Sequence, residues 1–279
     1  MQIFKEIDSL KLHLQQKRKE GSSVGLVPTM GALHEGHLSL IHASQAAADV
    51  TVCSLFVNPT QFNNPIDLEK YPRTLEKDIS MLESAGCDVL FTPEISTMYE
   101  RPGIIRFDFG ELDKVLEGKF RPGHFSGVAT VVSKLFHIVD PDHAFFGQKD
   151  YQQLQVITKV VEELKFNLEI HAVPIMREPD GLAMSSRNQR LSDEEKKRAL
   201  ILHESLDDAR RKLQAGRPWS EVRKDIVEKI SKVKDVQLEY FELAHRDDLT
   251  NTNNVGIGNG IVLTACFVGS VRLIDNMFI

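Results

Sequence analysis

The sequence predicts an α/β protein, in which a domain with a parallel sheet is followed by a smaller α+β domain. In the first two-thirds of the chain, short apolar runs alternate with segments of helical spacing, which is the pattern of βαβ units. After about Asn188, two helical segments come first and strand-like runs follow. The 279 residues, 42% hydrophobic and 27% charged, suit one large or two ordinary globular domains.

The larger domain is predicted from its apolar runs. We expect strands at residues 24–27, 50–57, 88–91, 144–146 and 168–173, and helices at 38–48 and 75–85. Parallel sheets bind ligands at the carboxyl ends of their strands. Functional residues are therefore expected just after these runs.

The smaller domain is predicted from a helix start signal and the apolar spacing after it. Ser192 and Glu195 form a capping box, apolar residues recur through 199–213, and Gly216 ends that helix. A second helix over 222–233 follows Pro218, and strands are expected at 236–243, 261–267 and 271–274. No Gly/Ser-rich linker is visible, so we expect the domains, 1–176 and 177–279, to pack closely.

Charge and cysteine content exclude several classes of protein. The formal charge of −6 argues against a general nucleic-acid or membrane-surface binder. Cys53, Cys87 and Cys266 form no CxxC pair, so a disulfide framework or a cysteine zinc site is not expected.

The apolar stretch at 255–274 is interrupted by Gly-Asn-Gly at 258–260 and is interpreted as two strands rather than a membrane span. Without a visible targeting peptide, we expect a cytoplasmic protein.

The most informative motif is Pro-Thr-Met-Gly-Ala-Leu-His-Glu-Gly-His at residues 28–37, between the first strand and a helix. Its glycines allow close backbone approach, and a helix N-terminus attracts anions. His34 and His37 are three residues apart and could donate hydrogen bonds to phosphate. A capping pair on a surface turn and a zinc pair remain open, although zinc needs a third ligand that no motif provides.

Two further segments carry polar groups that suit a polyphosphate. Residues 145–153 place Lys149, a point charge for phosphate, beside Asp150, which could hold a ribose hydroxyl or a metal. Residues 177–188 include Met-Ser-Ser-Arg at 184–187, with two hydroxyls and a guanidinium. Each segment alone is also compatible with a solvated loop. Residues 58–62 and 121–125 are weaker candidates, the first for an uncharged substrate group and the second for an anion.

Taken together, these segments resemble the pantoate–β-alanine ligase family. Residues 28–37 are similar to that family's version of the His-x-Gly-His signature of adenylyl transferases. Residues 58–62, 71–74, 121–125, 146–153 and 177–188 are similar to family blocks in the same order. Residues 184–187 are similar to the Lys-Met-Ser-Lys-Ser loop of class I aminoacyl-tRNA synthetases, although Ser186 and Arg187 replace its lysine-bearing part. The resemblance is strong over 24–190 and looser in the smaller domain.

The resemblance implies a fold and a reaction. The larger domain would be a Rossmann-like domain that binds ATP and pantoate, and the smaller domain a lid. Pantoate would attack the α-phosphorus of ATP to give pantoyl adenylate and pyrophosphate, and β-alanine would then give pantothenate and AMP. Mg²⁺ would accompany ATP. The family is usually a cytoplasmic homodimer without nucleic-acid or membrane partners, and residues 50–57 with Phe62 are our guess for a subunit contact.

The resemblance also implies site residues. Catalytic roles would fall to His34, His37 (the family's proposed proton donor), Lys149, Ser185, Ser186 and Arg187. The ATP-binding residues would be Met30, Gly31, Ala32, Leu33, His34, Glu35, Gly36, His37, Gly147, Gln148, Lys149, Asp150, Met176, Met184, Ser185, Ser186 and Arg187. Gln61 and Gln153 would hold pantoate, and Arg121 and His124 are secondary candidates for the site wall. No protein ligand is assigned to a metal.

Two other functions compete with this interpretation. Another nucleotidylyltransferase of the same superfamily would attach AMP to a phosphate-bearing substrate, and its acid pocket would need more basic residues than Gln61 and Gln153. A nucleic-acid-binding module is suggested by the synthetase-like signatures. The acidic charge and the lack of an anticodon-type basic domain argue against it.

Overall fold

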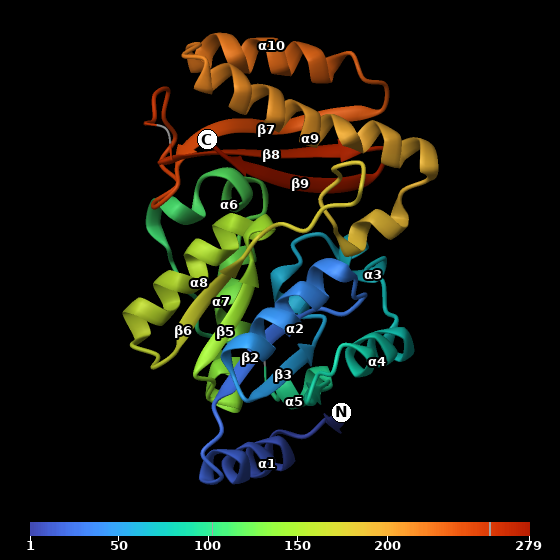
Figure 1. The fold of residues 1–279 in the computed structure, drawn as a ribbon, viewed down its shortest axis with the longest axis vertical. Coiled ribbons are helices and arrows are strands. Elements are labelled where there is room, and N and C mark those ends of the chain that lie inside the picture. Colours follow the sequence, from blue (N-terminus) through green and yellow to red (C-terminus); the bar gives the residue numbers. More distant parts are fainter. Residues whose placement is uncertain (102, 257) are drawn as a thin grey trace.

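The computed structural model describes residues 1–101, 103–256 and 258–279, and contains two sheets (Figure 1). The larger sheet has six strands in the order β1-β4-β3-β2-β5-β6, and all neighbouring pairs are parallel. Along the chain its strands are β1 (Gln2–Phe4), β2 (Val24–Thr29), β3 (Val50–Leu55), β4 (Val89–Phe91), β5 (His143–Gly147) and β6 (Glu169–Val173). The predicted parallel α/β fold is confirmed.

Helices cover both faces of this sheet because side chains alternate along each strand. On one face, Val27 and Phe145 pack with residues of α2 (Glu35–Ala47) and α4 (Leu75–Ser84). On the other face, Leu26 and Phe146 pack with residues of α1 (Ile7–Lys19), α7 (His124–Val139) and α8 (Tyr151–Leu164). The shorter helices are α3 (Pro65–Glu69), α5 (Ile95–Met98) and α6 (Leu116–Phe120), with 3₁₀ helices at Pro59–Gln61, Gly110–Asp113, Gln148–Asp150 and Ser186–Arg190.

The smaller sheet is antiparallel, in the order β7 (Val236–His245), β8 (Gly260–Val268) and β9 (Val271–Phe278). Its outer face packs against α9 (Asp193–Gln214) and α10 (Trp219–Ser231), at the top of Figure 1. Trp219 of α10 stacks on Phe241 of β7, with ring centroids 5.7 Å apart. The predicted capping box at the start of α9 is present, since Glu195 Oε2 accepts from the Ser192 amide at 2.8 Å.

The two sheets share one apolar core, as expected from the missing linker. The inner face of the small sheet, including Tyr240 and Leu263, belongs to the same buried cluster as Leu26 and Phe146. Buried apolar area of this kind stabilises the contact between the two sheets. The small sheet is therefore seated on the larger domain and is buried on both faces.

Some elements were not predicted or have different limits. The sequence analysis gave no range for β1, α1, α7 or α8, and the strand predicted at 50–57 ends at Leu55. In the stretch 255–274, the turn between the strands lies at Gly269 and Ser270 and not at 258–260, which instead lead into β8. Residue 257 of this stretch lies outside the described residues.

None of the helices within the described ranges has both the length and the apolar content needed to span a bilayer. All three cysteines are buried and unpaired.

Candidate active site

A cavity of about 190 Å³ lies at the carboxyl ends of β2 and β5 and beside the segment after β6. Its polar or charged wall includes His34, His37, Gln61, Tyr71, Lys149, Asp150, Gln153, Ser185, Ser186 and Arg187. The backbone and apolar wall includes Met30, Gly36, Phe56, Val128, Val131, Phe146, Gly147, Met176 and Met184. The structure thus brings most of the predicted site residues together from segments far apart in the chain.

The loop before α2 is fixed by a buried carboxylate of α4. Asp78 accepts hydrogen bonds from the amides of Ala32 and Leu33, at 2.9 and 2.8 Å. These two amides are thus already paired. Ala32 and Leu33 are buried, and the cavity lining does not include them or the predicted Gly31, Glu35 and Gln148. Their predicted role in ATP binding stays a prediction.

His34 and His37 stand side by side in the cavity, with ring centroids 4.0 Å apart. The spacing depends on Gly36, since a Cβ there would come within 3.0 Å of the His34 ring. The His34 amide donates to His37 Nδ1 at 3.3 Å. An accepting Nδ1 carries no proton, so the proton of a neutral His37 is on Nε2.

Both imidazoles are neutral near pH 7. Burial, with a smaller contribution from the Lys149 charge, lowers the pKa of His34 to about 4. Burial, His34 and Lys149 hold the pKa of His37 well below its usual value. His34 Nδ1 is a buried atom without a hydrogen-bond partner among the described residues. No third metal-ligating side chain joins this pair in the part of the chain that the structure describes, which disfavours the zinc interpretation.

Lys149 and Asp150 follow β5 on a 3₁₀ turn, and Lys149 Nζ lies 3.9 Å from Asp150 Oδ2. Asn276 of β9 holds this corner by donating to the backbone carbonyls of Gln148 and Lys149, both at 2.9 Å. The small sheet therefore helps to set the position of Lys149. This contact also gives the Gln148 carbonyl a structural partner.

The segment 176–190 closes one side of the cavity. The Met184 amide donates to the Met176 carbonyl at 3.0 Å, and Ser185 Oγ accepts from the Arg187 amide at 3.3 Å. Ser186 Oγ donates to the carbonyl of Ala32 at 3.0 Å, which ties this segment to the loop before α2. The Arg187 guanidinium lies 5.9 Å from the centre of the Tyr71 ring.

Gln61 is buried and held from several sides. Its Oε1 accepts from Asn58 Nδ2 at 3.0 Å, and its Nε2 lies 3.0 Å from Met30 Sδ. Gly127 on α7 allows this packing, because a Cβ there would overlap the Thr60 carbonyl oxygen. Gln153 enters the cavity from α8.

Arg121 and His124 lie beside Gln61 and outside the lining of this cavity. His124 Nδ1 lies 2.8 Å from the Gln61 carbonyl oxygen. Burial, followed by the Arg121 charge, lowers the pKa of His124 to about 3, so the ring is neutral and Nδ1–H donates to that carbonyl. Both residues are thus placed to position Gln61.

Sequence reasoning missed several residues that shape the site. Asp67 and Asp78 were not singled out, and Tyr71 was quoted only as part of a family block. Asp67 is two residues after Pro65 at the start of a short helix, and Asp78 lies in the first turn of α4. Acidic residues in a first turn are common helix signals, so nothing in the local sequence distinguishes them.

Comparisons with known proteins agree over the whole chain. A family model described as pantoate-beta-alanine ligase matches residues 2–278. The pantothenate synthetase of Acetivibrio thermocellus is 46% identical over 280 residues, which cover 100% of this chain and 99% of that protein. The corresponding protein of Bacteroides fragilis is 46% identical, over 99% of this chain and 98% of the relative.

Solved structures of similar proteins have the same fold. The pantothenate synthetase of Thermus thermophilus has a TM-score of 0.94 at 39% identity, covering 100% of this chain and 99% of that one. The pantoate-beta-alanine ligase of Francisella tularensis, described as complexed with beta-gamma ATP and beta-alanine, has a TM-score of 0.84 at 36% identity and covers 100% and 97%. This chain is therefore similar along its full length to proteins of one named activity.

Proposed function

The chain belongs to the pantoate–β-alanine ligase family, and we propose that its 190 Å³ cavity is where ATP, pantoate and β-alanine react. The enzyme condenses pantoate with β-alanine through a pantoyl adenylate and releases AMP and pyrophosphate. The observation that carries the assignment of the site is the convergence of His34, His37, Lys149 and Arg187 in one cavity with Gln61 and Gln153.

The first step needs charge stabilisation more than it needs a nucleophile from the protein. A pantoate carboxylate oxygen forms a bond to the α-phosphorus of ATP, and the bond from that phosphorus to pyrophosphate breaks. Negative charge grows on the phosphate oxygens, where fixed donors lower the barrier most. Lys149 and Arg187 supply positive charge. His37, neutral and protonated on Nε2, supplies a hydrogen bond without adding charge.

The proposed pantoate site combines amides with an apolar wall. Pantoate carries two hydroxyls and two methyl groups beside its carboxylate. Gln61 and Gln153 offer neutral donors and acceptors for the hydroxyls, and Val128 and Val131 of α7 offer apolar contact for the methyls. A buried polar site of this kind rejects analogues that lack the matching hydroxyl.

The second step uses the same cavity. The β-alanine amine attacks the carbonyl carbon of the adenylate, the bond from that carbon to the AMP oxygen breaks, and the amine loses a proton. Water would hydrolyse the adenylate, so exclusion of water from the cavity has a clear use. We propose that the smaller domain, residues 177–279, acts as the lid. Its first segment, residues 177–190, is the part that lies at the cavity.

Mg²⁺ is expected to accompany ATP, and the residues present are compatible with it. Asp150 is the only carboxylate among the described residues that line the cavity. Mg²⁺ in nucleotide sites is typically held by one or two carboxylates together with phosphates and water, so a single Asp fits. We propose Asp150 as its protein contact. The ion would neutralise phosphate charge when bound.

Assembly and location are further proposals. We propose a homodimer in the cytoplasm. Of the predicted contact, residues 50–56 are buried inside the chain because β3 is a central strand, so only Val57 and Phe62 are accessible to a partner. Light scattering of the purified chain measures the molar mass in solution. A mass of 31.5 kDa, that of one chain, would contradict the dimer.

The function is tested by following its two half-reactions separately. Pantoate-dependent exchange of pyrophosphate into ATP reports adenylate formation, and the subsequent release of AMP on addition of β-alanine reports ligation. We expect both with the purified chain. The absence of pantoate-dependent exchange from well-folded protein would contradict the proposal. Exchange that depends on a phosphate-bearing acceptor in place of pantoate would favour another nucleotidylyltransferase.

A further inference from the structure

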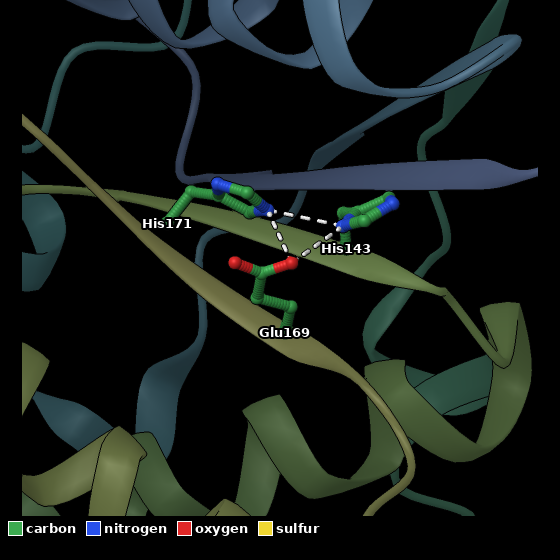
Figure 2. A group of neighbouring side chains, drawn as sticks. All are labelled: His143, Glu169 and His171. Atoms are coloured by element: carbon green, nitrogen blue, oxygen red, sulfur yellow. Dashed lines mark hydrogen bonds and ion pairs between the residues drawn. The ribbon is translucent and has the colours of Figure 1, made fainter.

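Three metal-ligating side chains meet on one face of the larger sheet, away from the cavity. They are His143 of β5 with Glu169 and His171 of β6, and Figure 2 shows their polar atoms turned toward one another. His143 Nδ1 and His171 Nε2 are 3.0 Å apart, and each lies 3.6 Å from Glu169 Oε2. None of the three has a role in the proposed ligase reaction.

The sheet register explains why these side chains converge. His143 pairs with Glu169 and Phe145 pairs with His171. Residues two apart in a strand share a face, so all four side chains lie on the same side of the sheet. α2 covers this side of the sheet. A Cβ added at Gly25 of β2 would contact both Phe145 and the α2 residue Ser44, so Phe145 and α2 lie on the same side.

The cluster packs against Phe145 and is partly open to solvent. The His171 ring stacks on Phe145, with centroids 4.6 Å apart and planes inclined by 13°. The side chains of His143 and His171 are 24% and 28% exposed, and that of Glu169 is 66% exposed. An ion bound here could keep a water molecule as its remaining ligand.

The separations of the three atoms match a zinc coordination site. In a tetrahedral Zn²⁺ site with bonds of about 2.0–2.1 Å, neighbouring ligand atoms are about 3.3 Å apart. The observed edges of 3.0, 3.6 and 3.6 Å are close to that value, so one point lies about 2 Å from all three atoms. In this structure the two nitrogens are at hydrogen-bond distance, so one ring donates its N–H to the other, and a bound cation would take the place of that proton.

We propose that His143, Glu169 and His171 form a binding site for one divalent transition-metal ion of the zinc class. Two imidazoles and one carboxylate form a donor set that suits Zn²⁺ and Co²⁺ better than Mg²⁺ or Ca²⁺, which prefer oxygen ligands. The site is independent of the ligase cavity. His143 begins β5 and Gly147, which lines the cavity, ends it, about 13 Å away along the strand.

The test is metal binding to the full-length, metal-stripped chain. Zn²⁺ is titrated against a chromophoric chelator, and Co²⁺ is titrated while visible absorption is recorded, because tetrahedral Co²⁺ absorbs far more strongly than octahedral Co²⁺. We expect one equivalent of Zn²⁺ to be retained and a tetrahedral Co²⁺ spectrum to appear. Glu169→Gln and His143→Ala are expected to weaken Zn²⁺ binding at least about tenfold, since each removes a ligand.

Controls separate this site from other histidines and from misfolding. His137 is an exposed histidine on α7, and His137→Ala is expected to bind Zn²⁺ like the parent chain. Glu169→Gln preserves side-chain shape and is expected to keep full ligase activity, which verifies its fold. The proposal is overturned if the parent chain retains no Zn²⁺. Equal Zn²⁺ affinity in the parent chain and in His143→Ala/His171→Ala would also overturn it, because the ion would then lie elsewhere, such as at His34 and His37.

Discussion

Asp67 holds Arg187 through an ion pair in which Arg187 Nη2 lies 2.9 Å from Asp67 Oδ2. The other carboxylate oxygen accepts from Arg190 Nη1 at 2.8 Å, so one acid of α3 binds two guanidinium groups of the 3₁₀ helix Ser186–Arg190. Burial alone would raise the pKa of Asp67, but the hydrogen bonds and charges of both arginines lower it. Asp67 is therefore ionised at neutral pH and fixes the proposed phosphate contact.

Replacing Asp67 with Asn is expected to separate nucleotide binding from turnover. Arg187 would lose its compensating charge and attract the anionic nucleotide more strongly, so KM for ATP should fall severalfold. The guanidinium would also lose its fixed position, so kcat for pyrophosphate exchange should fall about tenfold or more. Steady-state kinetics with varied ATP measure both quantities.

Asp207→Asn is the matched control, because Asp207 of α9 also pairs with two arginines, Arg210 at 2.6 Å and Arg211 at 3.2 Å, and none of these residues lines the cavity. Removal of these partly exposed pairs should leave KM and kcat unchanged. If Asp67→Asn behaves in the same way, Asp67 does not position Arg187.

Lys149→Ala is expected to reduce adenylate formation about 10²–10³-fold, as is typical when one fixed donor to a developing charge is removed. Pantoate-dependent pyrophosphate exchange measures this loss. The control is Lys159→Ala on the exposed side of α8, where only a salt bridge to Glu162 at 2.9 Å is lost. Exchange at a near-normal rate in Lys149→Ala would remove Lys149 from its proposed role.

Gln153→Leu is expected to raise KM for pantoate about tenfold or more and to leave KM for ATP nearly unchanged. The substitution keeps the size of the side chain but leaves a pantoate hydroxyl without its partner. Gln155→Leu on the same helix is the control, since the hydrogen bond that Gln155 makes to the Arg246 carbonyl, at 3.3 Å, is exposed. An equal rise in both KM values would place Gln153 at a shared part of the cavity and contradict its assignment to pantoate.

Glu117→Gln is expected to lower the free energy of unfolding at pH 7 by about 3 kcal/mol, because it breaks a buried ion pair. Glu117 of α6 accepts from Arg272 of β9 at 2.7 and 2.8 Å and from the Tyr240 hydroxyl at 2.8 Å. It thereby joins the larger domain to the small sheet. Urea unfolding measures the change. Glu228→Gln, which breaks an exposed pair, should lower the free energy of unfolding much less.

The same carboxylate makes a defined contribution to the pH dependence of stability. Burial would raise the pKa of Glu117, but the hydrogen bonds and charge of Arg272, with the Arg121 charge, lower it to about 2. Because the folded pKa is below the unfolded value of 4.5, the stabilisation is present above pH 4.5 and is lost as pH falls toward 2. The stability difference between the parent chain and Glu117→Gln should therefore shrink over that range.

Local sequence was sufficient for most of the elements and for the composition of the site. Apolar runs identified the strands β2 to β6, and the Ser192–Glu195 capping box marked the start of α9. Both signals could be read from the sequence because the spacing of apolar residues and helix capping depend on residues that are close together in the chain. The missed helix α7 is rich in β-branched valine and buried on most sides, so its sequence lacks the polar face that indicates a surface helix.

What the tertiary structure decided is which polar groups are already paired. The sequence placed histidines, hydroxyls, lysine and arginine near strand ends, and the family resemblance ordered them into a site. Only the fold shows that Asp78 binds the amides of Ala32 and Leu33, that Ser186 is tied to Ala32, and that Asp67 holds Arg187. The His143–Glu169–His171 cluster likewise depends on the register of β5 and β6. Such contacts join residues far apart in the chain, and no local spacing encodes the distance between them.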